Sequence, residues 1–232
     1  MIKTDSGKHK VDFSLHGIPV IGQFVQRAAE MEKLEWHLLH GPTVTGRQNV
    51  VVLHGLGGIG KTQLAVEFAR KHHSRFSSVF WLDGSSEESL KQSFARIMRR
   101  LPCTELTASG AKMLSQTTID LGEAVRECLH WLSLPTNRQW LLIFDNVDRD
   151  YPNTDDPQAY DVKNHLPNAD HGSVLITSRL SWLQKKGLGI KIGTVDAEQA
   201  RAMLKSNAGR KIESRIQFNS FKCNHYKLTH HF

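Results

Sequence analysis

The sequence predicts an α/β domain of three layers, in which a mostly parallel sheet of about five strands carries helices on both faces. Short apolar runs of strand length alternate along the chain with segments whose apolar residues recur every three or four positions. The runs are apolar almost throughout, which is typical of parallel strands that are covered on both faces. A chain of 232 residues with 39% hydrophobic and 23% charged residues is long enough to bury one such core.

The first half of the chain contains two expected strands and three expected helices. Residues 1–17 are polar and are expected to form a disordered lead-in. Ser85 and Glu88 have the spacing of a capping box and predict the start of the third helix. In order, we expect a helix over 24–40 that ends at Gly41-Pro42, a strand over 50–54, a helix to about Lys71, a strand over 79–83, and a helix with the apolar stripe Leu90, Phe94, Ile97, Met98 and Leu101.

The second half continues the alternation but includes two polar stretches. A connection over 102–116 and a loop over 148–170 lack any clear apolar period. A loop as long as the second is usually functional or mobile. The expected elements here are a helix over 118–133, strands over 140–145 and 173–177, a weaker strand over 189–193, and a short helix from Asp196.

Residues 55–62 carry the most informative motif, because they match the pattern G-x-x-x-x-G-K-[ST] at every fixed position. Glycines allow backbone N–H groups to turn toward a phosphate, and the helix that follows directs its N-terminus at the same anion. Lys61 would contact the β- and γ-phosphates, and the hydroxyl of Thr62 would hold Mg²⁺. The apolar strand before the motif and the helical pattern after it make a chance match to a glycine turn unlikely. The motif and its flanks together therefore predict the fold of a P-loop NTPase. The expected cofactor-binding residues are Gly55, Gly57, Gly58, Ile59, Gly60, Lys61, Thr62 and Gln63.

Two strand ends further along the chain supply charged partners for that loop. Asp145 ends an apolar strand and is expected to join Thr62 at Mg²⁺, although an aspartate there can also cap a turn. The next residue, Asn146, cannot accept a proton, which predicts weak hydrolysis; Asp148 is either a substitute base or a turn residue. Arg179 ends the following strand, where it can reach a γ-phosphate or remain a solvated loop residue. The predicted catalytic residues are Lys61, Asp145 and Arg179, and the predicted metal-binding residues are Thr62 and Asp145.

The net charge of +7 is concentrated at the C-terminus. Residues 1–200 contain 23 Lys and Arg against 22 Asp and Glu, whereas residues 201–232 contain 7 against 1. A basic face on the folded part is therefore not expected, and nucleic-acid binding is unlikely unless the tail provides it. The segment 208–232 contains Cys223, His225, His230 and His231, but their spacing fits no zinc signature and favours a disordered basic tail.

The number and spacing of the cysteines and the lack of long apolar segments indicate the cellular compartment of the protein. The three cysteines are widely spaced, which favours a reducing compartment without a disulfide framework. The N-terminal residues contain no apolar core of a secretory signal, and no run is long enough to span a bilayer. We therefore expect a cytoplasmic location and no membrane partner.

Four blocks of the sequence resemble the NB-ARC domain of the STAND class of P-loop NTPases, in the form found in fungal NOD-like receptors. They occur in the order of that family with plausible gaps, and the resemblance extends over about 18–207. The blocks are 55–65, which contains the glycine loop, 79–90, which reads VFWLDGSSEESL, 140–148, which reads WLLIFDNVD, and 172–179, which reads GSVLITSR.

The resemblance implies a nucleotide-controlled switch. It places the strand that ends at Thr177–Arg179 between the glycine-loop strand and the Asp145 strand. Bound ADP would keep the protein closed, and exchange for ATP would open it for self-association. Val25 and Arg27 resemble part of the family's adenine-side motif, although Gln26 stands where the family usually has glycine.

The sequence departs from the family after about Gly209. The helical subdomain and the winged helix that normally follow the nucleotide-binding domain are not recognisable, so 208–232 is expected to be a tail of a truncated receptor or the product of a wrong gene model.

The predicted function is an ADP/ATP-binding switch module that uses Mg²⁺ and is at most a weak ATPase. Its expected partners are an adenine nucleotide and a second copy of the domain. Three alternatives remain: an ordinary multiple-turnover P-loop ATPase or kinase, a fragment without a competent nucleotide site, and nucleic-acid binding through the tail, which would weaken steeply with salt.

Overall fold

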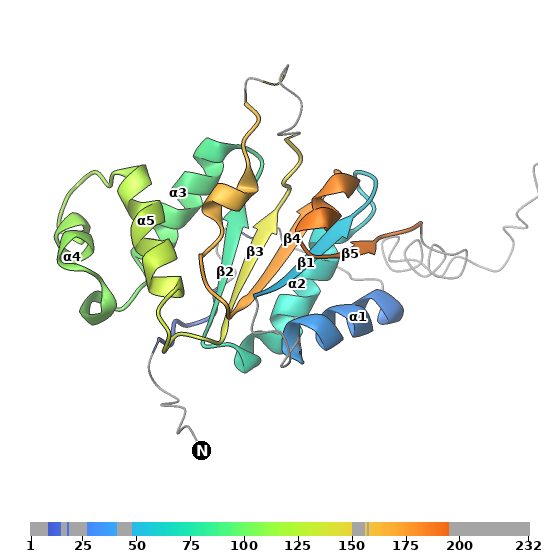
Figure 1. The fold of residues 1–232 in the computed structure, drawn as a ribbon, viewed down its shortest axis with the longest axis horizontal. Helices are drawn as coiled ribbons and strands as arrows, with labels where there is room; N and C mark the ends of the chain where they lie inside the picture. The colour runs from blue at the N-terminus through green and yellow to red at the C-terminus, as the bar shows by residue number, and fades with distance from the viewer. Residues whose placement is uncertain are drawn as a thin grey trace, which may run out of the picture. The chain divides into compact units, whose positions relative to one another are not determined.

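The computed structural model describes residues 9–14, 18, 27–40, 48–149, 156 and 158–194. Their centre is a five-stranded sheet with the strand order β2-β3-β4-β1-β5, in which every pairing is parallel (Figure 1). This confirms the predicted fold class, and it confirms that β4 lies between β1 and β3. The strands are β1 (Asn49–His54), β2 (Ser78–Asp83), β3 (Trp140–Asp145), β4 (Ser173–Ser178) and β5 (Leu188–Lys191).

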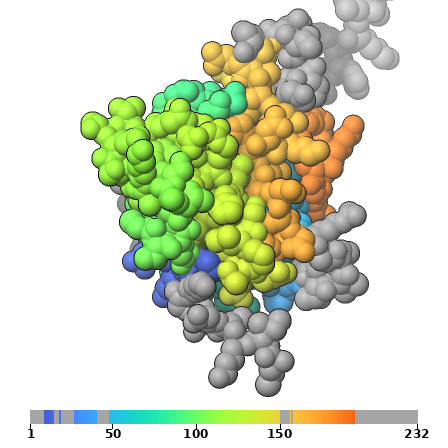
Figure 2. Space-filling view, turned by 60° about the vertical axis from the view of Figure 1, so that its left-hand side comes forward, coloured from blue at the N-terminus to red at the C-terminus, as the bar shows by residue number. Residues whose placement is uncertain are grey.

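Five α-helices surround the sheet in the described residues. Helices α1 and α2 pack against β1 and β4, whereas α3 packs against β2 and α5. Helix α4 lies outside α5, away from the sheet, and the two form one continuous surface of the domain (Figures 1 and 2). The helices are α1 (Ala28–Leu39), α2 (Lys61–His72), α3 (Glu87–Met98), α4 (Ala108–Leu114) and α5 (Leu121–Leu132), with 3₁₀ turns at His73–Arg75, Cys103–Glu105, Val162–His165 and Ser181–Lys186.

The core has two parts because alternate residues of each strand face opposite sides of the sheet. Since both sides are covered by helices, the strands are apolar at successive positions, as predicted. No helix of the described residues is long and apolar enough to cross a membrane. Toward α3 and α5 the strands contribute Val52, Phe80, Leu82, Leu142, Phe144, Val174 and Ile176, and toward α1 and α2 they contribute Val51, Leu53, Val79, Leu141, Ile143 and Leu175.

The start of α3 differs from the prediction by one residue. Ser86, rather than Ser85, is the N-cap, and its hydroxyl accepts a hydrogen bond from the Ser89 backbone N–H at 3.1 Å. The N–H of Ser85 is instead used by the Asp83 carboxylate at 3.0 Å. This local turn at the end of β2 moves the helix start along the chain.

Helix α4 was not predicted, because its seven residues include Gly110 and only two large apolar side chains, Met113 and Leu114, which are adjacent. Thr107 caps it by accepting a hydrogen bond from the Gly110 N–H at 3.1 Å. The N–H and hydroxyl of Thr107 both donate to the Glu127 carboxylate of α5, each at 2.7 Å. Contacts with α5 therefore stabilise a helix that has no amphipathic pattern of its own.

The expected disordered lead-in is wrong for the described residues 9–14. Val11 is buried, and its N–H donates to the Ser77 carbonyl at 3.0 Å. His9 is also buried and contacts Glu105 and Thr136. This segment therefore packs on the domain, and the rest of the predicted lead-in lies outside the described residues.

Several other predictions also lie outside the described residues. They are the first positions of the 24–40 helix, its Gly41-Pro42 stop, the helix from Asp196, and the tail over 208–232.

Candidate functional site: a cavity at the glycine loop

The loop between β1 and α2 has a backbone that depends on its glycines. Gly55, Gly58 and Gly60 have φ angles of +148°, +72° and +100°, which residues with a Cβ rarely adopt. A Cβ on Gly55 would also lie 2.6 Å from the carbonyl oxygen of Ile192. Gly60 is the N-cap of α2, so its left-handed conformation directs the start of that helix. The glycines therefore determine the backbone of this loop and the direction in which α2 begins.

Lys61 is the first residue of α2 and extends back over the loop. Its Nζ donates to the carbonyl oxygens of Gly55 and Leu56, each at 2.8 Å. Burial lowers the pKa of Lys61; the Asp148 carboxylate opposes this shift and the Arg179 guanidinium adds to it. The ammonium group is thus held among loop carbonyls, at the place where the motif expects phosphate oxygens.

Asp145 joins three elements at the carboxyl edge of the sheet. Its Oδ1 accepts a hydrogen bond from the Thr62 hydroxyl of α2 at 2.8 Å and one from the Thr177 hydroxyl of β4 at 2.6 Å. Burial raises the pKa of Asp145, and the Asp83 and Asp148 carboxylates raise it further against the effect of the two hydroxyls. A hydroxyl and a carboxylate side by side are hard oxygen ligands, so Thr62 and Asp145 fit Mg²⁺.

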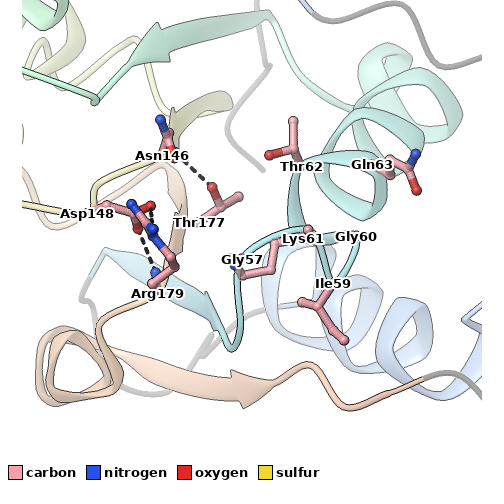
Figure 3. A pocket seen from close by; sticks show the side chains of 11 residues that line it. Gly57, Ile59, Gly60, Lys61, Thr62, Gln63, Asn146, Asp148, Thr177 and Arg179 are labelled. Atoms are coloured by element: carbon pink, nitrogen blue, oxygen red, sulfur yellow. Dashed lines mark hydrogen bonds and ion pairs between the residues drawn. The ribbon is translucent and has the colours of Figure 1, made fainter.

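A cavity of about 300 Å³ lies between the glycine loop and the ends of β3 and β4 (Figure 3). Seven of the eight cofactor-binding residues predicted around the glycine loop line it directly, while Gly55 does not. Asp145 reaches the cavity through its bonds to two lining residues, Thr62 and Thr177. The lining residues are Gly57, Gly58, Ile59, Gly60, Lys61, Thr62, Gln63, Asn146, Asp148, Thr177 and Arg179.

Arg179 lies at the wall of the cavity, as predicted, but it is paired with Asp148. Its Nε donates to Asp148 Oδ2 and its backbone N–H donates to Asp148 Oδ1, both at 2.6 Å (Figure 3). The side chain passes close to the glycine loop, because a Cβ on Gly57 would lie 3.6 Å from Arg179 Cδ.

The two predicted adenine-side residues differ in what the structure shows of them. Arg27 is buried, and it donates to the carbonyl oxygens of Ile59 at 2.9 Å and Gly193 at 3.1 Å. It thereby connects the start of α1, the glycine loop and the chain that follows β5, without lining the cavity. Val25 lies outside the described residues.

Thr177 is the site residue that the sequence analysis did not select. Besides its bond to Asp145, its Oγ1 accepts a hydrogen bond from the Asn146 N–H at 2.9 Å. A signal was present in the sequence, since Thr177 is a polar residue near the end of an apolar strand, two positions before Arg179. The resemblance already placed this strand beside the Asp145 strand, but the bond from the Thr177 hydroxyl to Asp145 is seen only in the structure.

Comparisons with known proteins agree with this architecture. Over 155 residues the chain is 28% identical to a nucleotide-binding leucine-rich repeat (NLR)-like protein of Hyaloscypha variabilis, covering 63% of this chain and 14% of that protein. The chain thus spans only a small part of the length of this curated relative.

Two solved structures share the fold at low sequence identity. Cdc6p of Pyrobaculum aerophilum matches with a TM-score of 0.51 and 12% identity, over 86% of this chain and 54% of that one. The ORC2 protein of Aeropyrum pernix in its ADP form matches with a TM-score of 0.51 and 16% identity, over 82% and 54%. At these identities the likeness concerns the fold alone.

The family model of the AAA ATPase domain matches residues 23–175, which is more than half of the chain. The match contains the glycine loop, all of β3 and the first half of β4, and it ends before the cavity-lining residues Thr177 and Arg179. The chain belongs to the AAA ATPase domain family.

Proposed function

We propose that this domain binds ADP and ATP with Mg²⁺ and acts as a slowly hydrolysing switch of the NB-ARC type in a receptor-like signalling protein. The observation that carries the proposal is the convergence of Lys61, Thr62 and Arg179 on one cavity, with Asp145 directly behind it. The NLR-like relative and the four sequence blocks support the receptor assignment.

In this proposal the phosphates take the place of loop carbonyls as partners of Lys61. The ammonium now donates to Gly55 and Leu56, and a phosphate cradled by the glycine-loop N–H groups would compete for it with a stronger, charge-assisted bond. The N-terminus of α2 supports the same anion. Thr62 and Asp145 would hold Mg²⁺, which neutralises phosphate charge when it is bound.

Slow hydrolysis follows from the absence of a free base among the described residues that line the cavity. Asn146 follows Asp145, and its amide cannot accept a proton. Asp148 is the sole carboxylate of the lining, and both of its oxygens are bonded to Arg179. We therefore expect turnover well below the ~1 s⁻¹ at which ordinary enzymes begin.

The test is titration calorimetry of the full chain with ADP and with ATP, each with Mg²⁺, comparing wild type with Lys61→Ala. Because Lys61 supplies the cation at the phosphate position, we expect the variant to bind ADP at least about 100-fold more weakly, which corresponds to about 2.7 kcal/mol. Lys71→Ala is the matched control, since Lys71 lies on the same helix with a side chain that is 57% exposed and pairs with Glu35.

Each result has a distinct meaning. Equal ADP affinity in wild type and Lys61→Ala would contradict the assignment of the phosphate site. If the folded wild type bound neither nucleotide, the chain would be a fragment without a competent site. Turnover of many ATP molecules per second would favour an ordinary ATPase.

A further inference from the structure

The ion pair between Asp148 and Arg179 closes the cavity on the side of the strand ends. Asp148 lies three residues beyond β3 and Arg179 directly follows β4. The carboxylate binds both the backbone N–H and the Nε of Arg179, each at 2.6 Å. Its side chain is 13% exposed, whereas that of Arg179 is 62% exposed. The carboxylate is therefore the fixed partner, and the arginine is the one with room to move.

The backbone after β3 is built to bring Asp148 to this position. Asn146 has a φ angle of +65°, a left-handed conformation that asparagine tolerates better than most residues. The Val147 N–H donates to the Thr177 carbonyl at 3.0 Å, and the Ser178 hydroxyl donates to the Val147 carbonyl. These bonds extend the β3–β4 connection beyond the sheet, so Asp148 is held by the strand ends and does not depend on a free loop.

Both charges of the pair act at the phosphate position. Each lines the same cavity as Lys61, and each influences the Lys61 ammonium electrostatically, with opposite signs. A third phosphate on a nucleotide held by Lys61 adds negative charge within this cavity. It would compete with the Asp148 carboxylate for the guanidinium, because both are anions that bind arginine through charge-assisted hydrogen bonds.

We propose that Asp148 is a positioning residue that selects ADP over ATP by holding Arg179, so that a triphosphate binds only by taking Arg179 away from it. This inference rests on the proposed function, since it concerns the same nucleotide site. It gives the carboxylate in the cavity wall a role other than that of a base, since its bond to the Arg179 backbone N–H does not depend on the Arg179 side chain. A diphosphate leaves the pair intact, whereas a triphosphate must break it.

The experiment measures the ratio of ATP affinity to ADP affinity by calorimetry with Mg²⁺ in wild type, Asp148→Asn, Arg179→Ala and the double variant of the full chain. Asp148→Asn keeps an oxygen for the Arg179 N–H but removes the charge that competes with the phosphate. We expect the ratio to rise about tenfold, as expected when a close charge pair of partly exposed groups is removed. ADP affinity should change less than about threefold.

Asp170→Asn is the matched control, because it removes the same charge from a side chain that is 68% exposed and lies before β4, outside the cavity lining. It should leave the ratio unchanged. Arg179→Ala should lower the ratio about tenfold, since ATP loses its additional partner. In that background Asp148→Asn should change the ratio less than about threefold.

An unchanged or lower ratio in Asp148→Asn would overturn the proposal, and so would an equally large rise in the Arg179→Ala background, because Asp148 would then act without Arg179. Circular dichroism checks that each variant is folded. Should Asp148→Asn fail to fold, an unchanged ratio in Arg179→Ala would still overturn the proposal. Loss of Lys61-dependent ADP binding in the wild type is a separate result that contradicts the proposed function itself.

Discussion

The pKa values of two largely buried carboxylates of this domain are shifted in opposite directions: that of Asp145, beside the glycine-loop cavity, is raised, and that of Glu105, which pairs with His9, is lowered. Burial acts to raise the pKa of both. At Glu105 the Trp131 indole, the His9 ring and the His9 backbone N–H donate hydrogen bonds, and together they bring the pKa below its usual value. At Asp145 two hydroxyls do not compensate for burial, and the pKa remains raised.

The difference lies in the kind of donor. The indole and backbone N–H groups at Glu105 have fixed directions, so they remain directed at the carboxylate. The hydroxyls of Thr62 and Thr177 can rotate and also accept bonds, so they can turn away when another partner arrives. Glu105 is thus satisfied as a structural anchor for the N-terminal segment, while Asp145 is a carboxylate that a cation would stabilise. The following predictions test this contrast.

The largest effect is expected from Asp145→Asn on binding. Asparagine can still accept both hydroxyl bonds at Oδ1 but lacks the charge that attracts Mg²⁺. We expect the enhancement of ADP affinity by Mg²⁺ to fall about 100-fold, measured by calorimetry with and without the ion. Because the raised pKa means that the charged form is disfavoured in the fold, the thermal midpoint should rise by about 1–3 °C.

A lower midpoint together with unchanged Mg²⁺ dependence would show that Asp145 is a structural residue like Glu105. Asp120→Asn is a suitable comparison, since Asp120 caps α5 and lies away from the cavity. That variant should lose some stability and leave the Mg²⁺ dependence unchanged.

Glu105→Gln should have the opposite effects to Asp145→Asn: it should lower stability and leave nucleotide binding nearly unchanged. It weakens the charge-assisted bonds from His9 and Trp131, and we expect the free energy of unfolding to fall by about 1–3 kcal/mol in urea titrations. ADP affinity should stay within about twofold of wild type. The control is Glu123→Gln, because Glu123 is 43% exposed on α5 and its pair with Arg126 should contribute little. A selective loss of ADP binding in Glu105→Gln would contradict the conclusion that Glu105 has a purely structural role.

The smallest expected effect is on the pH dependence of stability, to which Glu105 and Asp145 should contribute with opposite signs. The folded-state pKa of Glu105 lies below its usual value of 4.5, so its stabilising contribution is present above that value and is lost as the pH falls through the folded pKa. The folded-state pKa of Asp145 lies above 3.8, so its contribution is present at low pH and is lost as the pH rises through the raised pKa.

Both contributions can be measured as the free energy of unfolding in urea between acidic and neutral pH. With rising pH, wild type should become more stable relative to Glu105→Gln and less stable relative to Asp145→Asn. Parallel curves for the two variants would contradict the distinction between the carboxylates.

Where a local sequence pattern forms part of the candidate site, the structure has that part at the position that the pattern predicts. The glycine loop, the apolar strand that ends at Asp145 and the apolar strand that Arg179 follows are all where the patterns place them. It did not predict Thr177 as a ligand of Asp145 or the bond between Asp148 and Arg179. These contacts join residues about 30 positions apart, and no periodicity encodes the distance between them.

By itself, the sequence determined the order of strands and helices, the parallel sheet buried on both faces and the backbone of the glycine loop. Each of these follows from preferences within a few consecutive residues, namely apolar runs, helical spacing and glycines that tolerate positive φ. The tertiary structure alone decided that α4 forms against Glu127, that His9 is anchored at Glu105, and that Arg179 faces Asp148. Those features depend on buried charges finding partners across the fold, because an unpaired buried charge costs more free energy than any local preference supplies.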